Sequence, residues 1–177
     1  VLPGKVVVLG GGVVGTNAIR MAMGMEAHVT VIDKSLARLK ELDFRFGGML
    51  NTIFATREAT QRHVTGADLV VGAVLVPGAA APKLVTEDMV KAMKPGSVLL
   101  NFSRDAIVEE DAVLAGLASK HLRNYVCDFP SQKNKGNPAV IALPHLGAST
   151  QEAEENCAVM VAEQLRDYLE HGNLFNT

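Results

Sequence analysis

The sequence predicts a doubly wound α/β fold, in which a parallel sheet of about seven strands is covered by helices on both faces and followed by a long C-terminal helix. Three observations predict it. Short β-branched runs alternate with helical patterns along the chain. These runs are apolar on both faces, as in a parallel sheet. A glycine-rich turn joins the first strand to the first helix. Such sheets bind ligands beyond the carboxyl ends of their strands, so we expect function in the strand-to-helix loops.

The first half of the chain supplies four strands and three helices. The expected strands cover residues 5–9, 28–32, 50–55 and 68–76. The expected helices cover residues 13–25, 36–46 and 57–64. In the first helix, apolar residues recur at helical spacing from Val14 to Met25, and Gly47 ends the second helix.

The second half continues the same alternation. We expect helices at residues 86–93 and 109–119, and strands at residues 97–102, 125–129 and 140–143. A long helix follows, from about residue 150 to residue 170. Ser149 and Glu152 are spaced for a capping box at its start, in which each side chain bonds the other residue's backbone amide. Gly172 provides a left-handed exit at its end.

Composition favours one domain and excludes several classes of partner. The 177 residues are 48% hydrophobic and 20% charged, a balance that builds a buried core. The net charge of −2 gives no electrostatic reason to expect nucleic acid or an anionic membrane as partner. No apolar run reaches the roughly 18 residues that a membrane helix needs.

The cysteines and the first residues bear on where the chain works. Cys127 and Cys157 match no metal or disulfide spacing, so we expect two reduced thiols, no metal site and a cytoplasmic location. The chain opens with VLPGK, which has no signal-peptide pattern, and enters a strand at once. We interpret this start as that of a domain excised from a longer protein.

The first strand-to-helix loop carries the strongest motif. Residues 10–15 read GGGVVG and contain G-x-G-x-x-G directly after a strand. We expect Gly10 to allow the tight turn, Gly12 to let a pyrophosphate approach the backbone, and Gly15 to let the helix pack close to the sheet. The helix amino terminus then offers free N–H groups and a partial positive charge to the phosphates.

An acid at the end of the second strand completes this fingerprint of a Rossmann dinucleotide-binding domain. Asp33 lies about 20 residues after the glycines, where its carboxylate accepts hydrogen bonds from the adenosine ribose. The same charge repels a 2′-phosphate, so we expect NAD(H) rather than NADP(H). The neighbouring Lys34 either softens this preference or is a solvated surface lysine. The alternative for the whole motif is a glycine-rich turn without a ligand.

The loop after the fourth strand, residues 74–79, is apolar and contains a Pro-Gly turn. In this fold such a loop lies beneath the far half of the cofactor, and we expect Val74 and Leu75 to contact it. A purely structural turn is the alternative.

Residues 1 to about 99 resemble the NAD domain of the alanine dehydrogenases. The resemblance is carried by KVVVLGGGVVG at residues 5–15, IDKS at 32–35 and GAVLVPG at 72–78, and it continues from LVT at 84–86 to MKPGS at 93–97. It implies a Rossmann NAD-binding domain from a longer enzyme that has a second, substrate-binding domain.

Residues 101–177 resemble a different family, the D-3-phosphoglycerate dehydrogenase branch of the D-2-hydroxyacid dehydrogenases. The matching runs are NFSR at 101–104, DFP at 128–130, PHLGAST at 144–150, EENCA at 154–158 and DYLEHGN at 167–173. We therefore expect an engineered or recombined chimera of two Rossmann domains, joined within residues 97–102. A natural relative that looks mixed is the alternative.

The second resemblance implies catalytic residues. In the hydroxyacid dehydrogenases an arginine binds the substrate carboxylate and a histidine shuttles the alcohol proton; Arg104 and His145 match these two. The glutamate that keeps the histidine basic is replaced by Gln132, whose amide cannot stabilise an imidazolium by charge. Alternatively, Arg104 makes a phosphate or surface contact, and His145 is a loop histidine without present use.

The resemblances also imply cofactor contacts. Asp128 matches an acid that contacts the nicotinamide amide, with a strand-end cap as the alternative. Besides Gly10, Gly12, Gly15 and Asp33, the expected NAD(H) contacts are Val13, Val14, Val74, Leu75, Ser103, Arg104, Asp128, His145 and Gly147.

Three functions stay open at this point. The first is a single cofactor-binding domain, residues 1–177, with little or no turnover because both parent families place substrate against a second domain. The second is an NAD-dependent oxidoreductase acting on a small 2-hydroxy or 2-oxo acid. The third is a structural or assembly domain with an empty cleft. We also expect a homodimer, because the last helix carries apolar residues that need cover at Cys157, Val161, Leu165 and Leu169.

Overall fold

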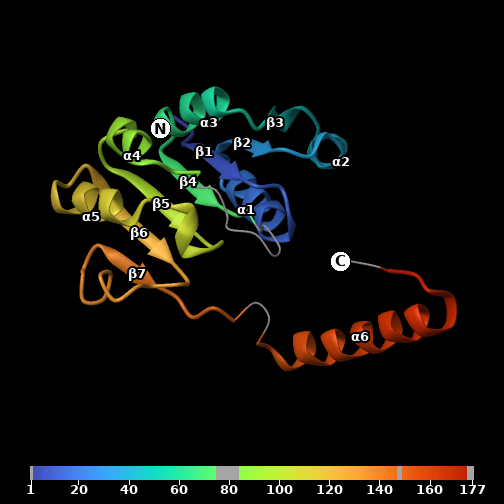
Figure 1. The fold of residues 1–177 in the computed structure, drawn as a ribbon. Helices are drawn as coiled ribbons and strands as arrows, with labels where there is room; N and C mark the ends of the chain where they lie inside the picture. Colours follow the sequence, from blue (N-terminus) through green and yellow to red (C-terminus); the bar gives the residue numbers. More distant parts are fainter. Residues whose placement is uncertain (1, 75–83, 147–148, 175–177) are drawn as a thin grey trace. The chain divides into compact units, whose positions relative to one another are not determined.

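The computed structural model describes residues 2–74, 84–146 and 149–174. By its internal contacts the chain divides into two compact units, Val1–Leu143 and Pro144–Thr177. The first unit holds the sheet and its covering helices, and the second holds the C-terminal helix (Figure 1).

The first unit is built on a parallel sheet with the strand order β3-β2-β1-β4-β5-β6-β7. Its strands are β1 (Lys5–Leu9), β2 (His28–Asp33), β3 (Leu50–Phe54), β4 (Leu69–Gly72), β5 (Ser97–Asn101), β6 (Leu122–Cys127) and β7 (Val140–Ala142). The order reverses between β1 and β4, so the loops after these two strands flank the switch point where this fold binds ligands. The doubly wound α/β fold is confirmed.

Helices cover both faces of the sheet. The helices of this unit are α1 (Val13–Gly24), α2 (Leu36–Phe46), α3 (Arg57–Thr65), α4 (Glu87–Ala92) and α5 (Glu110–Ala118), with single 3-10 turns at Gly47–Met49 and Asp105–Ile107. In β1, Val6 and Val8 belong to the core layer under α1 and α2. Val7 and Leu9 belong to the layer under α3, α4 and α5. Alternate side chains of one strand thus pack into the two cores on opposite faces of the sheet, which is why the strands are apolar throughout.

Two strands differ from their expected bounds by more than two residues. The expected strand at 68–76 ends at Gly72, because its neighbour β1 stops where Gly10 turns the chain. β6 begins at Leu122 instead of residue 125. There the polar Arg123 and Asn124 hid the start of a strand whose backbone pairs with β5.

The second unit is one helix with flanking segments, α6 (Gln151–His171). Its N-cap is Thr150, whose Oγ1 accepts a hydrogen bond from Ala153 N at 3.1 Å. The expected capping box of Ser149 and Glu152 is therefore wrong, because the helix starts one residue later and places alanine at the third position. Gly172, with φ of 71°, ends the helix as expected. Within the described ranges, no helix is long and apolar enough to cross a membrane.

Candidate functional site

The turn after β1 requires glycine at two positions. Gly10 has φ of +98°, and a Cβ there would lie 2.7 Å from the carbonyl oxygen of Ala73 in the neighbouring loop. A Cβ on Gly15 would lie 1.9 Å from the carbonyl oxygen of Gly10. Since both neighbours are backbone atoms, neither can move aside without shifting the chain. The turn therefore holds β4 and α1 as close to β1 as the backbone permits.

The amino terminus of α1 is left open. Gly12 is its N-cap and makes no side-chain hydrogen bond, and no acidic residue lies in the first turn. The helix's first backbone bond runs from Thr16 N to Gly12 O at 2.8 Å, so the N–H groups of Val13 and Val14 have no partner within the helix. A Cβ on Gly12 would meet no atom within 4 Å. This end can accept an anionic group close to the backbone.

Four other helices show what α1 lacks. The amino termini of α2, α3, α4 and α6 are each closed by a hydroxyl side chain that accepts a backbone N–H: Ser35, Thr56, Thr86 and Thr150. A hydroxyl cap stabilises a helix by about 1 kcal/mol. α5 has no side-chain cap either, but it carries Glu110 and Asp111 in its first turn. The amino terminus of α1, with neither a cap nor an acid, therefore leaves donors free at the switch point of the sheet.

Asp33, at the end of β2, lies against the glycine turn. Its Oδ2 accepts a hydrogen bond from Gly11 N at 2.7 Å, and its Oδ1 accepts one from Ser35 N at 2.8 Å. The side chain is half-buried, while the neighbouring Lys34 is exposed. The structure thus brings the acid of the fingerprint to the glycine loop.

Sequence reasoning missed Arg38 and Thr16. Arg38 Nε donates to Gly11 O at 2.6 Å, and its Nη2 donates to Thr16 Oγ1 at 2.7 Å. Thr16 Oγ1 in turn lies 2.8 Å from Gly12 O. The Gly11 peptide is therefore held through its N–H by Asp33 and through its carbonyl by Arg38. The spacing offered a signal, because a residue five positions after the strand-end acid lies in the first turn and a half of the next helix.

We expect Arg38→Gln to weaken NADH binding about tenfold. The variant loses the charge-assisted hydrogen bond to the Gly11 carbonyl, so the Gly11 peptide is no longer held in one orientation. Isothermal titration of both proteins with NADH measures this. Arg20→Gln, an exposed position on α1, is the control and should bind like the parent chain. Equal affinities of Arg38→Gln and the parent would contradict a role for Arg38 in the loop.

The loop after β4 packs against the same turn. Ala73 N donates to Leu9 O at 2.8 Å, and Val74 is half-buried with its Cγ2 3.0 Å from where a Cβ on Gly10 would lie. Val74 is thus beside the glycine turn. Leu75, its expected companion, lies outside the described residues.

The motif after β5 is organised by a buried asparagine. Asn101 Nδ2 donates to Arg104 O at 2.9 Å and lies 3.3 Å from the Tyr125 hydroxyl. Its Oδ1 accepts a bond from Ser103 N at 3.2 Å. Ser103 is buried, and its Oγ has no hydrogen-bond partner within the described part of the chain. A buried hydroxyl without a partner is costly, which makes Ser103 a site where a ligand group could bond.

Arg104 and Phe129 lie together after β5 and β6. The Arg104 guanidinium carbon is 5.4 Å from the centre of the Phe129 ring, within the range of a cation–π contact. The arginine motif and the Asp-Phe-Pro motif, 25 residues apart in sequence, are therefore neighbours in space. Phe129 can orient the guanidinium without neutralising its charge.

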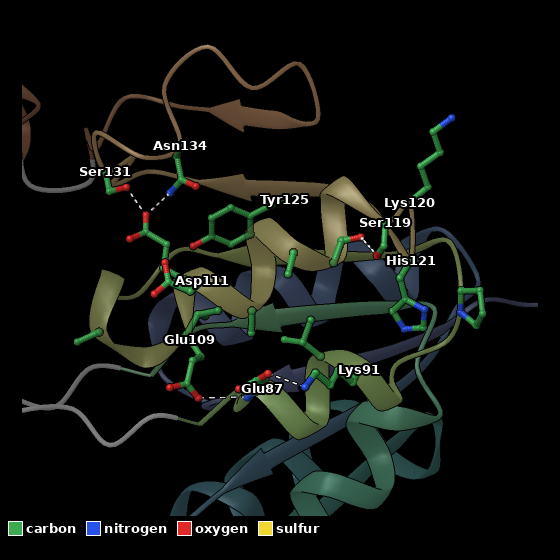
Figure 2. Close-up of a pocket in the computed structure, with 18 of the residues that line it drawn as sticks. Glu87, Lys91, Glu109, Asp111, Ser119, Lys120, His121, Tyr125, Ser131 and Asn134 are labelled. Carbon is green, nitrogen blue, oxygen red and sulfur yellow. Dashed lines mark hydrogen bonds and ion pairs between the residues drawn. The ribbon is translucent and has the colours of Figure 1, made fainter.

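The loop that carries Asp128 and Gln132 is fastened to α5. Asn134 Nδ2 donates to Glu110 Oε1 at 2.9 Å, and the Ser131 hydroxyl donates to the same oxygen (Figure 2). Lys133 adds an exposed ion pair with Asp111. Gln132 itself is exposed. The bonds fix the loop on both sides of Gln132 while leaving its amide in solvent.

Burial keeps the side chains of Tyr125 and Cys127, on the strand β6 that precedes this loop, neutral. It raises the pKa of Tyr125 to about 12 and raises the pKa of the Cys127 thiol. A protonated phenol can still bond Asn101, and a protonated thiol is a weak nucleophile. Both groups therefore support the loop and are poor candidates for the chemistry.

A cavity of this unit lies away from the glycine turn. A groove of about 1050 Å³ runs along α5, between α4 and the loop after β6 (Figure 2). No residue of the turn after β1 lines it. The candidate site is instead defined by the free N–H groups at the start of α1, by the carboxylate of Asp33 and by the open approach to the backbone at Gly12. Of the other predicted residues, His145 lies in the second unit, and Gly147 lies outside the described residues.

Residues 1–106 match the sequence profile of the family "Alanine dehydrogenase/PNT, C-terminal domain". The chain belongs to this family. An alanine dehydrogenase of Halomonas elongata is 57% identical over 105 residues, which are 59% of this chain and 28% of that protein. Alanine dehydrogenase 2 of Staphylococcus aureus strain USA300 is 50% identical over 102 residues, 58% of this chain and 27% of the relative. The chain thus spans less than a third of these curated relatives.

Solved structures agree with this membership of the alanine dehydrogenase/PNT family. An L-alanine dehydrogenase matches 96% of the chain and 46% of its own length, with a TM-score of 0.65 and 33% identity. A D-2-hydroxyisocaproate dehydrogenase matches 97% of the chain and 54% of its own, with a TM-score of 0.73 but 21% identity, which shows the shared fold alone. The dehydrogenase domains of this family bind NAD(H), so the expected cofactor is confirmed at the level of the family.

Proposed function

We propose that this chain is an NAD(H)-binding domain of the alanine dehydrogenase type, in which the first turn of α1 binds the pyrophosphate and Asp33 binds the adenosine ribose. The observation that carries the proposal is the open amino terminus of α1. Gly12 leaves its approach clear, no side chain caps it, its first turn holds no acidic residue, and Asp33 Oδ2 lies 2.7 Å from the adjoining Gly11 N. When bound, the cofactor supplies or accepts a hydride.

The nicotinamide half of the cofactor is assigned to the loops after β4, β5 and β6. Val74 and Leu75 would lie beneath it, Ser103 offers a hydroxyl that no described residue bonds, and Asp128 would contact the amide. Arg104 is proposed to bind a substrate carboxylate from its position over Phe129. The assignment of His145 and Gly147 rests on the resemblance of residues 144–150 to the hydroxyacid dehydrogenases.

We further propose that residues 1–177 form one dinucleotide-binding domain of mixed descent. The match to the alanine dehydrogenase family ends at residue 106, a few residues after the expected seam at 97–102. Beyond it, the motifs resemble those of the hydroxyacid dehydrogenases. A natural relative of mixed appearance is the alternative. A homodimer and a cytoplasmic location are also proposed, from the apolar stripe of α6 and the two unpaired cysteines.

Because the relatives are more than three times as long as the matched segment, residues 1–177 by themselves are proposed to bind cofactor with little or no turnover. The second candidate is an active oxidoreductase, favoured by the exposed Arg104. The third is an assembly domain with an empty cleft.

Isothermal titration with NADH, and with NADPH in parallel, separates these functions. The proposal expects saturable NADH binding that is tighter than NADPH binding. A cooperative thermal melt without NADH binding would favour the assembly domain. Absorbance at the NADH band then tests turnover, with pyruvate or phosphohydroxypyruvate as oxidant and alanine as reductant. Sustained NADH consumption with either oxo acid (with ammonium supplied alongside pyruvate), or sustained NADH formation from alanine and NAD+, would establish the oxidoreductase and overturn the absence of turnover.

A further inference from the structure

A second groove is lined by residues at the amino ends of β1, β2 and β3 and by residues of α3. It has a volume of about 530 Å³. The candidate cofactor site is at the opposite, carboxyl end of the same strands. A ligand in this groove therefore cannot belong to the glycine turn.

The part of the groove's floor on β2 and β3 is polar, which is unusual for a parallel sheet covered on both faces. The position on β1 that pairs with Thr30 is the buried Val7. Thr30 and Asn51 are paired in register on β2 and β3, and Asn51 Nδ2 donates to Thr30 Oγ1 at 3.3 Å. One step further along the same face, Ile32 is buried in the core. On β2 and β3 this sheet face thus changes from apolar to polar toward the amino ends of the strands.

The walls of the groove are basic. Lys5 and His28 come from β1 and β2, and Arg62 and His63 come from the last turn of α3. Among the residues that the structure describes, no aspartate or glutamate lines it. The nearby Asp68 accepts a bond from Lys5 N at 2.8 Å and pairs with Lys94 at 2.7 Å, so its charge is already matched.

The carboxyl end of α3 accounts for only some of the basic side chains that line the groove. Cationic side chains offset the negative end of a helix, which suits Arg62 and His63. Lys5 lies on a strand, where no helix end accounts for a cation. Burial and the neighbouring Arg62 lower the pKa of His63, so an anion in the groove would favour its protonated form.

We propose that the groove between α3 and the amino ends of β1, β2 and β3 binds a small, multiply charged oxyanion, held by Lys5, His28, Arg62 and His63. Phosphate and carboxylate groups share the chemistry that fits such a set, since guanidinium and ammonium groups donate charge-assisted hydrogen bonds to both. Thr30 and Asn51 add polar atoms at the floor. The site is independent of the cofactor site in position and in residues.

Nuclear magnetic resonance of the full 177-residue chain tests this proposal. Inorganic phosphate and citrate are titrated in turn at constant ionic strength, with chloride as the balancing anion. We expect saturable shifts of the His28 and His63 ring signals, and a rise in the pKa of His63. The stronger of the two titrants identifies whether phosphate or carboxylate is preferred.

Arg62→Gln should weaken the binding about tenfold, the effect of one charge-assisted bond. Arg57→Gln, an exposed position at the start of the same helix, is the matched control and should leave it unchanged. His28→Gln provides a second variant on a different element. Shifts that rise linearly, that chloride reproduces, that stay equal in Arg62→Gln, or that are confined to the amides of α1 would overturn the proposal.

Discussion

Replacing Gly15 with alanine is expected to destabilise the fold by about 3 kcal/mol or more, the upper range for overpacking at a buried site. The added Cβ would lie 1.9 Å from the carbonyl oxygen of Gly10. Relief requires α1 to move away from the turn, and that movement displaces the N–H groups proposed to bind the pyrophosphate. Urea unfolding measures the loss of stability, and isothermal titration should detect no NADH binding.

Alanine substitutions at two other glycines of α1 and its N-cap distinguish a loss of stability from a loss of NADH binding. Gly24→Ala, in the last turn of α1, introduces a Cβ that meets no atom within 4 Å, so stability should be unchanged or slightly higher. Gly12→Ala also meets no protein atom, and should leave stability intact while weakening NADH binding. If Gly15→Ala unfolds at the same urea concentration as Gly24→Ala, the close approach of α1 to the turn does not limit the fold.

Replacing Asp33 with alanine is expected to weaken NADH binding about 30-fold or more, which corresponds to about 2 kcal/mol. The variant loses the charge-assisted bonds proposed to the ribose hydroxyls and also the bond to Gly11 N at 2.7 Å. Repulsion of a 2′-phosphate disappears with the carboxylate, while Arg38 stays beside the turn. The ratio of NADH to NADPH affinity should therefore fall, as parallel isothermal titrations will show.

Asp33→Asn tests whether geometry or charge dominates. An asparagine can still accept from Gly11 N but carries no charge, so it should keep the turn and lose most of the preference over NADPH. Asp43→Ala, exposed on α2, is the control for removing an acid and should bind NADH like the parent. NADH binding by Asp33→Ala that equals the control would rule out the proposed ribose contact.

Local signals explain why so many elements were predictable. The bounds of α2 agree with expectation, because the apolar spacing and Gly47 are encoded within the helix and its neighbours. The fingerprint of Gly10, Gly15 and Asp33 is likewise local to two strands and a turn. The predicted N-cap of α6 was wrong because the local signal was ambiguous. Ser149 and Thr150 are both good caps, and the helix uses Thr150.

Other features depend on partners that are distant in sequence. Arg38 reaches Gly11 across 27 residues, and Arg104 reaches Phe129 across 25. Neither pair has a spacing rule, because each depends on which strands are neighbours. The polar floor of the second groove has the same origin, since Thr30 and Asn51 meet through the register of β2 with β3.

The sequence by itself determined the doubly wound fold, the alanine dehydrogenase character of its first hundred residues and the glycine turn with its acid. These depend on the periodicity of side chains and on steric limits within a few residues. Only the tertiary structure decided that the Gly11 peptide is held from both sides, that Ser103 is buried with a hydroxyl that no described residue bonds, and that a basic groove opens at the amino ends of β1, β2 and β3. Such features arise from packing, which places groups from separate strands and helices within bonding distance and leaves open the spaces that no helix covers.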